Sequence, residues 1–219
     1  MCGRTPMHFI NHSLDSPFIV LYSTNMKKNT LTNKDIALQS AFTLFLTKGF
    51  LATSMDDIVA HSKVSKTNIY YYFKSKEELL LAIVNQLIAH YEQRINYIVS
   101  QNELTVQEKL EAVLHILSDT IEQNNYLGGC PFLTLYTQTP IDAVEIRDRI
   151  KSFFEKQLHG VELILAQGIA RQELKEELPV KQIAMLIVSS IEGALFLAQA
   201  SNNQDMIKNL FPTLASMLK

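Results

Sequence analysis

The residues best suited to contact nucleic acid lie close together in one short stretch of this chain. Four side chains there can donate to phosphate oxygens or to the edges of bases: Lys66, Thr67, Asn68 and Tyr71. If the stretch is helical, Ile69 and Phe73, four residues apart, face inward and leave those four polar side chains exposed. The pattern therefore predicts a helix with one buried face and one face able to contact DNA.

Three consecutive tyrosines, Tyr70, Tyr71 and Tyr72, follow these polar residues. Consecutive helix positions diverge around the axis, so the three rings cannot all enter a core and at least one must be exposed. An exposed aromatic ring beside lysines suits a phosphate surface. The alternative is a small helical subdomain whose tyrosines only cover an apolar floor.

The charge distribution favours the DNA-binding interpretation. Residues 26–78 contain eight lysines and five acidic residues, a net charge of +3, whereas residues 79–219 contain eleven basic and sixteen acidic residues, a net of −5. The whole chain has a formal net charge of −2, which excludes a generally polycationic binder. Any affinity for DNA must therefore be local to the N-terminal part.

Three helices joined by very short turns position this stretch, and the sequence predicts them over residues 34–48, 55–61 and 66–73. Ser54 with Asp57 has the form of a capping box, Ser65 is placed as an N-cap, and Gly49 ends the first helix. Two short helices joined by a turn of three or four residues predict a helix-turn-helix.

The rest of the chain also shows helical periodicity. Further helices are expected over residues 75–100, 106–123, 130–139, 142–172, 180–200 and 204–218. Ser75 and Glu78 form a second capping-box pattern at the start of the first of these. A hydrophobic content of 47% with only 7 Gly and 6 Pro agrees with a compact all-α protein. We therefore predict an N-terminal helix-turn-helix domain, residues 30–77, and a second helical domain, residues 78–219.

The first 29 residues lack a helical period and are predicted to be a disordered extension. Alternatively, translation starts at Met26, where a basic arm begins. Lys27, Lys28 and Lys34 could then contact the neighbouring DNA backbone or remain a solvated tail.

Residues 41–79 resemble the DNA-binding domain of TetR-family transcriptional regulators. The residues that match the family's spacing without a gap are Ala41, Phe45, Gly49-Phe50, Thr53, Ile58, Val64-Ser65, Thr67, Ile69-Tyr70, Phe73 and Lys74-Ser75-Lys76-Glu77-Glu78-Leu79. The resemblance implies base contacts from Lys66, Thr67 and Tyr71. It also implies phosphate contacts from Thr53 or Ser54, from Tyr70 and from Lys76.

One position departs from the family pattern. The family usually has Ala-Gly-Val-Ser in the turn, and this chain has Ser62-Lys63-Val64-Ser65. Lys63 thus replaces a glycine that tolerates positive φ, at a cost of about 1 kcal/mol if that backbone is kept.

The segment from Val180 to Ala200 is apolar nearly all round and needs packing partners on two sides. By itself it could be the central helix of a monomer. Its small residues also permit close approach of a second subunit, and they are Ser189, Ser190, Gly193 and Ala194. The resemblance implies a homodimer formed through the last two helices, which would place two recognition helices about 34–36 Å apart on a palindromic operator.

The resemblance further implies a ligand pocket between the long helices. The residues expected to line it, each of which could instead be ordinary core, are Tyr91, His115, Tyr126, Cys130, Phe132, Tyr136, Phe153, Phe154 and Phe196. Cys130 stands at the start of a predicted helix, whose dipole could stabilise a thiolate. The alternative for Cys130 is a buried and inert thiol.

Other classes of function lack support in the sequence. There is no H-E-x-x-H motif, no G-x-S-x-G motif and no glycine-rich phosphate loop, and the two cysteines and six histidines show no metal-ligand spacing. We expect no cofactor, and no apolar run long enough to span a bilayer. The favoured function is a cytoplasmic, ligand-responsive repressor with a small-molecule effector. The alternatives are a constitutive DNA-binding protein and a helical enzyme.

Overall fold

The computed structural model describes residues 31–123, 129–203 and 205–217, and every regular element in these ranges is an α-helix. In chain order the helices are α2 (Asn33–Thr47), α3 (Met55–Ser62), α4 (Lys66–Tyr72), α5 (Lys76–Ser100), α6 (Val106–Gln123), α7 (Pro131–Gln138), α8 (Val144–Ala170), α9 (Val180–Ser201) and α10 (Asp205–Met217). The predicted all-α fold is confirmed. The predicted extension and the alternative start at Met26 lie outside the described residues and stay predictions.

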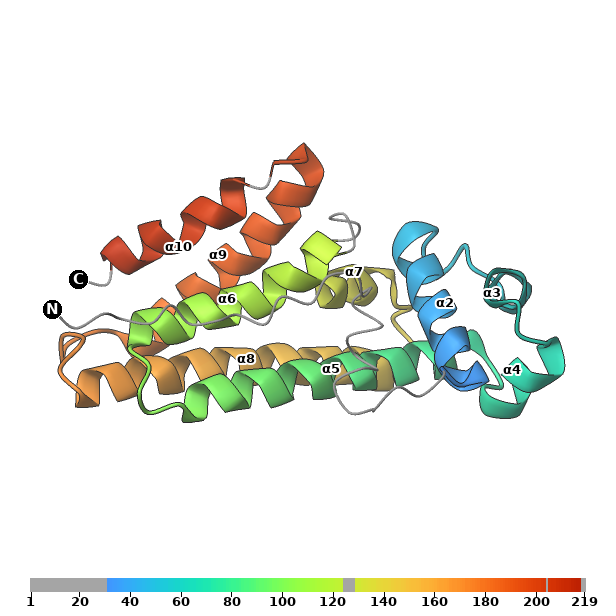
Figure 1. Ribbon diagram of the computed structural model, residues 1–219, viewed down its shortest axis with the longest axis horizontal. Coiled ribbons are helices and arrows are strands. Elements are labelled where there is room, and N and C mark those ends of the chain that lie inside the picture. Colours follow the sequence, from blue (N-terminus) through green and yellow to red (C-terminus); the bar gives the residue numbers. More distant parts are fainter. Residues whose placement is uncertain (1–30, 124–128, 204, 218–219) are drawn as a thin grey trace, which may run out of the picture.

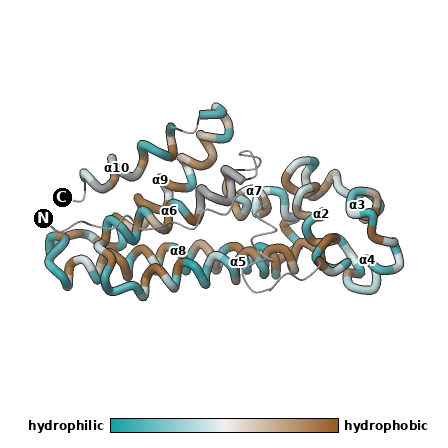
Figure 2. Tube along the Cα trace, viewed as in Figure 1, coloured by the Kyte–Doolittle hydropathy of each residue, from teal (hydrophilic) through white to brown (hydrophobic). Residues whose placement is uncertain are grey.

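The helices form two bodies at opposite ends of an elongated molecule (Figure 1). Helices α2, α3 and α4 gather at one end, and the long helices occupy the other. In that second body α5 and α8 run side by side, α9 packs on α8, and α10 packs on α9. Hydrophobic residues recur along these long helices, whereas hydrophilic residues are prominent on α3 and α4 (Figure 2).

Local sequence signals determine the ends of the first helices. The hydroxyl of Ser54 accepts from the Asp57 N–H at 3.1 Å and the Asp57 carboxylate accepts from the Ser54 N–H at 2.8 Å, so the predicted capping box forms. Gly49 follows α2 with a φ of +95°, which favours glycine. The second predicted box forms only in part: Ser75 caps the Glu78 N–H, but the Glu78 carboxylate accepts from the Lys74 N–H at 2.7 Å.

The first body has a core of its own. Phe45, Ile58 and Ile69 are fully buried and join α2, α3 and α4, and the Phe45 ring contacts the edge of Phe50 at 5.1 Å between centroids. Leu79, in the first turn of α5, completes this core.

Helix α5 connects the two bodies. Its 25 residues extend over about 37 Å at the usual rise per residue. The first turns pack on α2, and the later turns pack on α6 and α8. The domain boundary drawn after residue 77 falls within the first turn of this helix, so the bodies share one continuous element and movement of α5 can reach both.

A buried lysine joins α5, α6 and α8 at the end of the second body that lies away from the helix-turn-helix. Lys109 of α6 is 1% exposed, and its ammonium donates to the Val99 carbonyl at 2.9 Å and to Gln167 Oε1 at 2.6 Å. Val106 packs so closely on Gly168 that a side chain at position 168 would collide with it. These contacts fix α6 between α5 and α8.

Two features of the second body differ from expectation. Helix α8 runs from Val144 to Ala170 and not from residue 142 to residue 172, because a turn closed by the Ala143 N–H and the Pro140 carbonyl precedes it and Gln172 has a φ of +61° after it. Helix α9 is long and apolar enough, by length and composition, to cross a membrane, which the sequence-based expectation missed. In the structure α9 packs against α8 and α10.

Candidate nucleic-acid interface

Helix α4 presents a polar face because its apolar residues fasten it to the first body. Ile69 is fully buried and Phe73 is 5% exposed, while Ser65 caps the helix by accepting from the Asn68 N–H at 3.3 Å. Thr67 is exposed and Tyr71 is 74% exposed. The predicted burial of Ile69 and Phe73 and the predicted exposure of Lys66, Thr67 and Tyr71 are confirmed. The predicted exposure of Asn68 is not, because Asn68 is half-buried.

The turn before α4 keeps the backbone of the glycine-containing pattern without the glycine. Lys63 adopts a left-handed conformation, with φ 57° and ψ 14°, and its N–H donates to the Val59 carbonyl at 3.1 Å. The hydroxyl of Ser62 accepts from the Val64 N–H at 3.2 Å. The turn is therefore retained at the predicted cost of about 1 kcal/mol for a non-glycine residue in this region.

Lys66 of α4 is paired with an acidic residue but remains available to a DNA phosphate. Lys66 forms an exposed ion pair with Asp56 at 2.8 Å, and its ammonium lies 5.9 Å from the centroid of the Tyr70 ring. Hydrogen bonding to Asp56 raises the pKa of Lys66 above its usual value. Exposed pairs of this kind contribute little to stability, so a phosphate can displace Asp56.

Asn68 is less well placed for base contacts than its neighbours. It is half-buried, and its side-chain oxygen is buried without a hydrogen-bond partner among the described residues. A bidentate contact to adenine requires both the oxygen and the amino group of an asparagine. Thr67 and Tyr71 therefore remain the better candidates for contacts to base edges.

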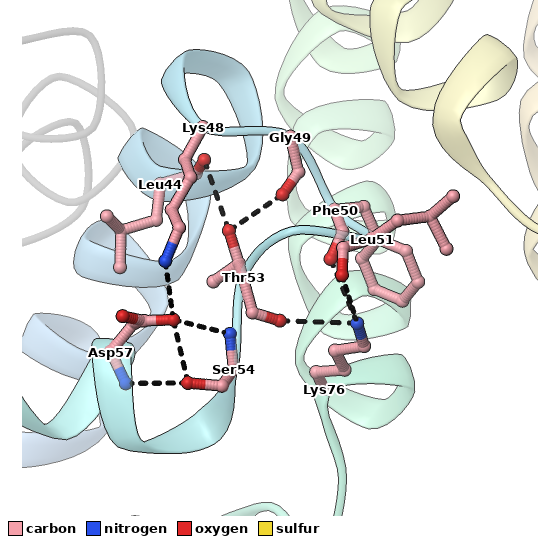
Figure 3. A network of polar contacts seen from close by, with 9 residues as sticks. All are labelled: Leu44, Lys48, Gly49, Phe50, Leu51, Thr53, Ser54, Asp57 and Lys76. Atoms are coloured by element: carbon pink, nitrogen blue, oxygen red, sulfur yellow. Dashed lines mark hydrogen bonds and ion pairs between the residues drawn. The ribbon is translucent and has the colours of Figure 1, made fainter.

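Thr53 and Lys76 stabilise the loop between α2 and α3 instead of facing outward (Figure 3). Thr53 is 1% exposed, and its hydroxyl donates to the Gly49 carbonyl at 2.7 Å. The Lys76 ammonium donates to the carbonyls of Phe50, Leu51 and Thr53 at 3.0, 3.4 and 3.2 Å. It also lies 4.5 Å from the centroid of the Phe50 ring. This geometry argues against the expected phosphate contacts of both side chains, since the donors of each are already engaged.

Ser54 is exposed, but its hydroxyl donates to the Asp57 carboxylate at 2.7 Å. Hydrogen bonds from Lys48 and Ser54 hold the pKa of Asp57 well below its usual value, so this carboxylate stays ionised. A phosphate approaching Ser54 would meet that negative charge. An open groove of about 470 Å³ nevertheless lies here, lined by residues 51–55 and 74–77 at the N-termini of α3 and α5. The positive ends of both helix dipoles face it.

The described residues that were expected to bind a ligand are divided between the core and the surface. Tyr91, Phe132 and Phe153 are almost fully buried and pack on one another, the last two with stacked rings 3.8 Å apart. Phe154 packs on the edge of Phe153, and Tyr136 lies 4.1 Å from the guanidinium of Arg147. These aromatic side chains therefore serve mainly as core.

The other residues of the expected set have different surroundings where the structure describes them. His115 is exposed and Tyr126 lies outside the described residues. A cavity of about 190 Å³ has only Cys130 and Phe196 of the expected set among its lining residues, which are Gly129, Cys130, Leu133, Thr134, Thr137, Phe196 and Gln199.

Cys130 is buried, which agrees with the buried and inert thiol and not with a thiolate stabilised by the helix dipole. Burial raises the pKa of its thiol well above the usual range, and the neighbouring Glu192 raises it further. Desolvation of the charged form thus outweighs the helix dipole, and the thiol stays protonated.

The outer side of α9 is apolar and exposed. Met185, Leu186, Phe196 and Leu197 are 57%, 45%, 56% and 50% exposed. Ser189 is exposed among them, and a side chain added at Gly193 would meet nothing within 4 Å. Ser190 and Ala194 are half-buried at the margin of this face. Large apolar patches of this kind mark interaction surfaces.

In the described residues a braced helix-turn-helix stands at one end and a separate helical body at the other, which is the arrangement expected of a DNA-binding transcriptional regulator. The model of bacterial regulatory proteins of the tetR family matches residues 37–83, and the model of the tetracyclin repressor-like C-terminal domain matches residues 107–213. The chain belongs to the TetR family of transcriptional regulators.

Two relatives, one named as a probable transcriptional regulator and one as a transcriptional repressor, and a solved structure with the same fold agree with this assignment. The chain is 28% identical over 144 residues to the probable HTH-type transcriptional regulator YttP of Bacillus subtilis, covering 65% of this chain and 68% of that protein. It is 24% identical over 161 residues to the HTH-type transcriptional repressor ComR of Escherichia coli, covering 74% and 77%. A TetR transcriptional regulator from Chloroflexus aurantiacus shares the fold with a TM-score of 0.72 and 24% identity, covering 84% and 92% of the two chains.

Two functional contacts escaped the sequence analysis. Lys76 was assigned to DNA and not to the loop carbonyls. In addition, Gln138 at the end of α7 accepts from the Phe50 N–H at 2.9 Å, which joins the second body to the loop before α3. No local pattern could reveal this pair, since 88 residues separate its members.

Proposed function

We propose that this regulator is a cytoplasmic homodimeric repressor that binds a palindromic operator and is released by a small-molecule effector. The observation that carries the proposal is the outward face of α4, where Thr67 and Tyr71 are exposed beside Lys66 and the helix is fixed from behind by Ile69. A recognition helix must pack firmly against the rest of its domain and must also expose polar side chains to the DNA. The similarity to a relative named as a repressor supports the direction of regulation.

Dimerisation through α9 and α10 provides a second recognition helix, which binds the other half-site of the operator. The exposed apolar side of α9, centred on Ser189 and Gly193, is suited to close helix packing. Two copies joined there would present two α4 helices to successive turns of the major groove, about 34–36 Å apart.

Helix α7 offers a route from effector to DNA. Leu133, Thr134 and Thr137 on this helix line the cavity of the second body, and Gln138 bonds the Phe50 N–H in the first body. A ligand that displaces α7 can therefore reorient the helix-turn-helix, provided that it binds the two orientations with different affinity.

The proposal is tested by selecting genomic DNA fragments with the full chain and then measuring operator affinity of variants. We expect Tyr71→Ala to weaken operator binding about tenfold or more while leaving binding to random DNA within about threefold. The matched control is Tyr97→Ala, which truncates a tyrosine that is 67% exposed on α5. Equal effects of the two substitutions, or a selected DNA without two-fold symmetry, would contradict the proposal.

A further inference from the structure

A cluster of buried polar groups lies where α7, α8 and α9 meet. It consists of Cys130 at the N-cap of α7, Gln157 of α8 and Glu192 of α9, and we call it the Glu192 cluster. Cys130 and Gln157 are each 3% exposed, and Glu192 is largely buried. The cluster thus places three polar side chains from three helices inside the second body.

The polar atoms of this cluster lack adequate partners. Both carboxyl oxygens of Glu192 and both polar atoms of the Gln157 amide are buried without a hydrogen bond among the described residues. The Cys130 thiol and the Gln157 amide lie beside the Glu192 carboxyl and partly stabilise its charged form, which lowers its pKa and opposes the larger effect of burial. Buried groups left in this way reduce stability, and proteins retain them mainly where function requires them.

The acidic group of the cluster determines whether a bound ligand should be positively or negatively charged. Within the part of the chain that the structure describes, the groups that influence the Glu192 carboxyl are Cys130 and Gln157, and neither is a lysine or an arginine. Burial raises the pKa of Glu192, as expected for a carboxyl without a compensating cation. A cation brought to this carboxyl would supply both the missing charge and the missing donors, whereas an anion would be repelled.

The surroundings of the cluster are apolar and include a cavity. Cys130 belongs both to the cluster and to the lining of the 190 Å³ cavity. Phe196, which also lines the cavity, stands one helical turn after Glu192 on α9. Phe153, one turn before Gln157 on α8, stacks on Phe132. The cavity therefore offers the apolar side chains of Leu133 and Phe196 and meets the cluster at Cys130, whereas Glu192 and Gln157 are not among its lining residues.

We propose that the Glu192 cluster is the polar subsite of the effector and that the effector is a compact aromatic molecule carrying a protonated amine. The ammonium donates to the Glu192 carboxylate and to the side-chain oxygen of Gln157, and the apolar part packs on Leu133 and Phe196. The inference rests on the proposed function, because it identifies the ligand class to which the regulator responds. It also explains why a buried carboxyl is kept on an otherwise apolar helix.

The test compares three probes of nearly the same shape: 2-phenylethylamine, 2-phenylethanol and phenylacetate. Their binding to the full chain is measured by titration calorimetry at neutral pH, for the unchanged protein and for Glu192→Gln. We expect the amine to bind at least about tenfold more tightly than the alcohol and the acid. Glu192→Gln should remove that preference and leave affinity for the alcohol within about threefold. It should also raise the melting temperature, since it replaces an uncompensated acid by a neutral isostere.

The matched control is Glu162→Gln, which removes an acid of α8 placed outside the cluster, and it should leave the preference for the amine unchanged. Equal affinity for the three probes, tightest binding of phenylacetate, no binding of the amine, or an unchanged preference in Glu192→Gln would each overturn the proposal. Operator binding of the unchanged protein and of Glu192→Gln is measured separately. If the unchanged protein binds its operator normally but does not bind the amine, the amine subsite is rejected and the proposed function stands. If the unchanged protein recognises no operator, the proposed function itself is rejected.

Discussion

Replacing Lys76 by methionine separates a structural role of this side chain from a role in DNA binding. The Lys76 ammonium donates to three carbonyls of the loop between α2 and α3 and lies over the Phe50 ring. Methionine keeps the length and most of the apolar contact of the lysine side chain but removes all three donors. The Thr53 carbonyl, which is part of a half-buried loop, would then lose this donor, and the Phe50 carbonyl would keep only its bond from the Thr53 N–H at 3.3 Å.

The expected loss of stability follows from these contacts. Hydrogen bonds that involve a charged group contribute about 1.5–3 kcal/mol net, and the partial exposure of Lys76 places the total near the lower part of that range, about 2 kcal/mol. For a chain of this size such a change corresponds to about 4–8 °C in melting temperature.

Two measurements on Lys76→Met check this reasoning. Thermal unfolding should show the loss, and the salt dependence of binding to random DNA should keep its slope, because a lost phosphate contact would change the slope by about 0.9. The matched control is Lys34→Met, which removes the same charge from an exposed position of α2 and should not lower the melting temperature. An unchanged melting temperature together with a flatter salt slope would show that Lys76 contacts phosphate and that the structural interpretation is wrong.

Three further predictions concern the second body and its connection to the first. Burial and the nearby Arg94 lower the pKa of His90 to about 4 in the folded protein, so stability should fall as the pH drops from about 6.5 to about 4. Because His90 is partly exposed, we expect about 1 kcal/mol of this fall, measured by urea unfolding, to disappear in His90→Gln. Gly193→Arg should fold normally, since that position has open space, but should sediment as a monomer or a much weaker dimer, whereas Ala89→Arg on α5 should remain dimeric. Gln138→Leu should bind the operator but lose most of its response to effector. Gln138→Glu, which keeps an acceptor for the Phe50 N–H, should retain the response. A normal response in Gln138→Leu would show that α7 does not transmit effector binding to the helix-turn-helix.

The sequence by itself determined the helices and the helix-turn-helix. These features depend on interactions between residues three or four apart, and such interactions can be predicted from the local sequence. The capping of α3 by Ser54 and of α4 by Ser65, the end of α2 at Gly49, and the bounds of α6 all agree with the sequence-based predictions. The positive φ of Lys63 was not determined by the local sequence: the family resemblance indicated a glycine-like backbone there, and the structure shows that Lys63 adopts it.

Only the tertiary structure decided what several polar side chains do. A local pattern cannot distinguish a lysine that binds phosphate from one that binds carbonyls 23 to 26 residues away, as Lys76 does. It likewise could not reveal that Thr53 is buried, or that Gln138 bonds the Phe50 N–H across 88 residues. The Glu192 cluster exists because three helices from different parts of the chain converge, and burial then raises the pKa values of Glu192 and Cys130. The reason is physical: desolvation and long-range hydrogen bonds depend on which surfaces are brought together in space, and that is fixed by packing of the whole chain.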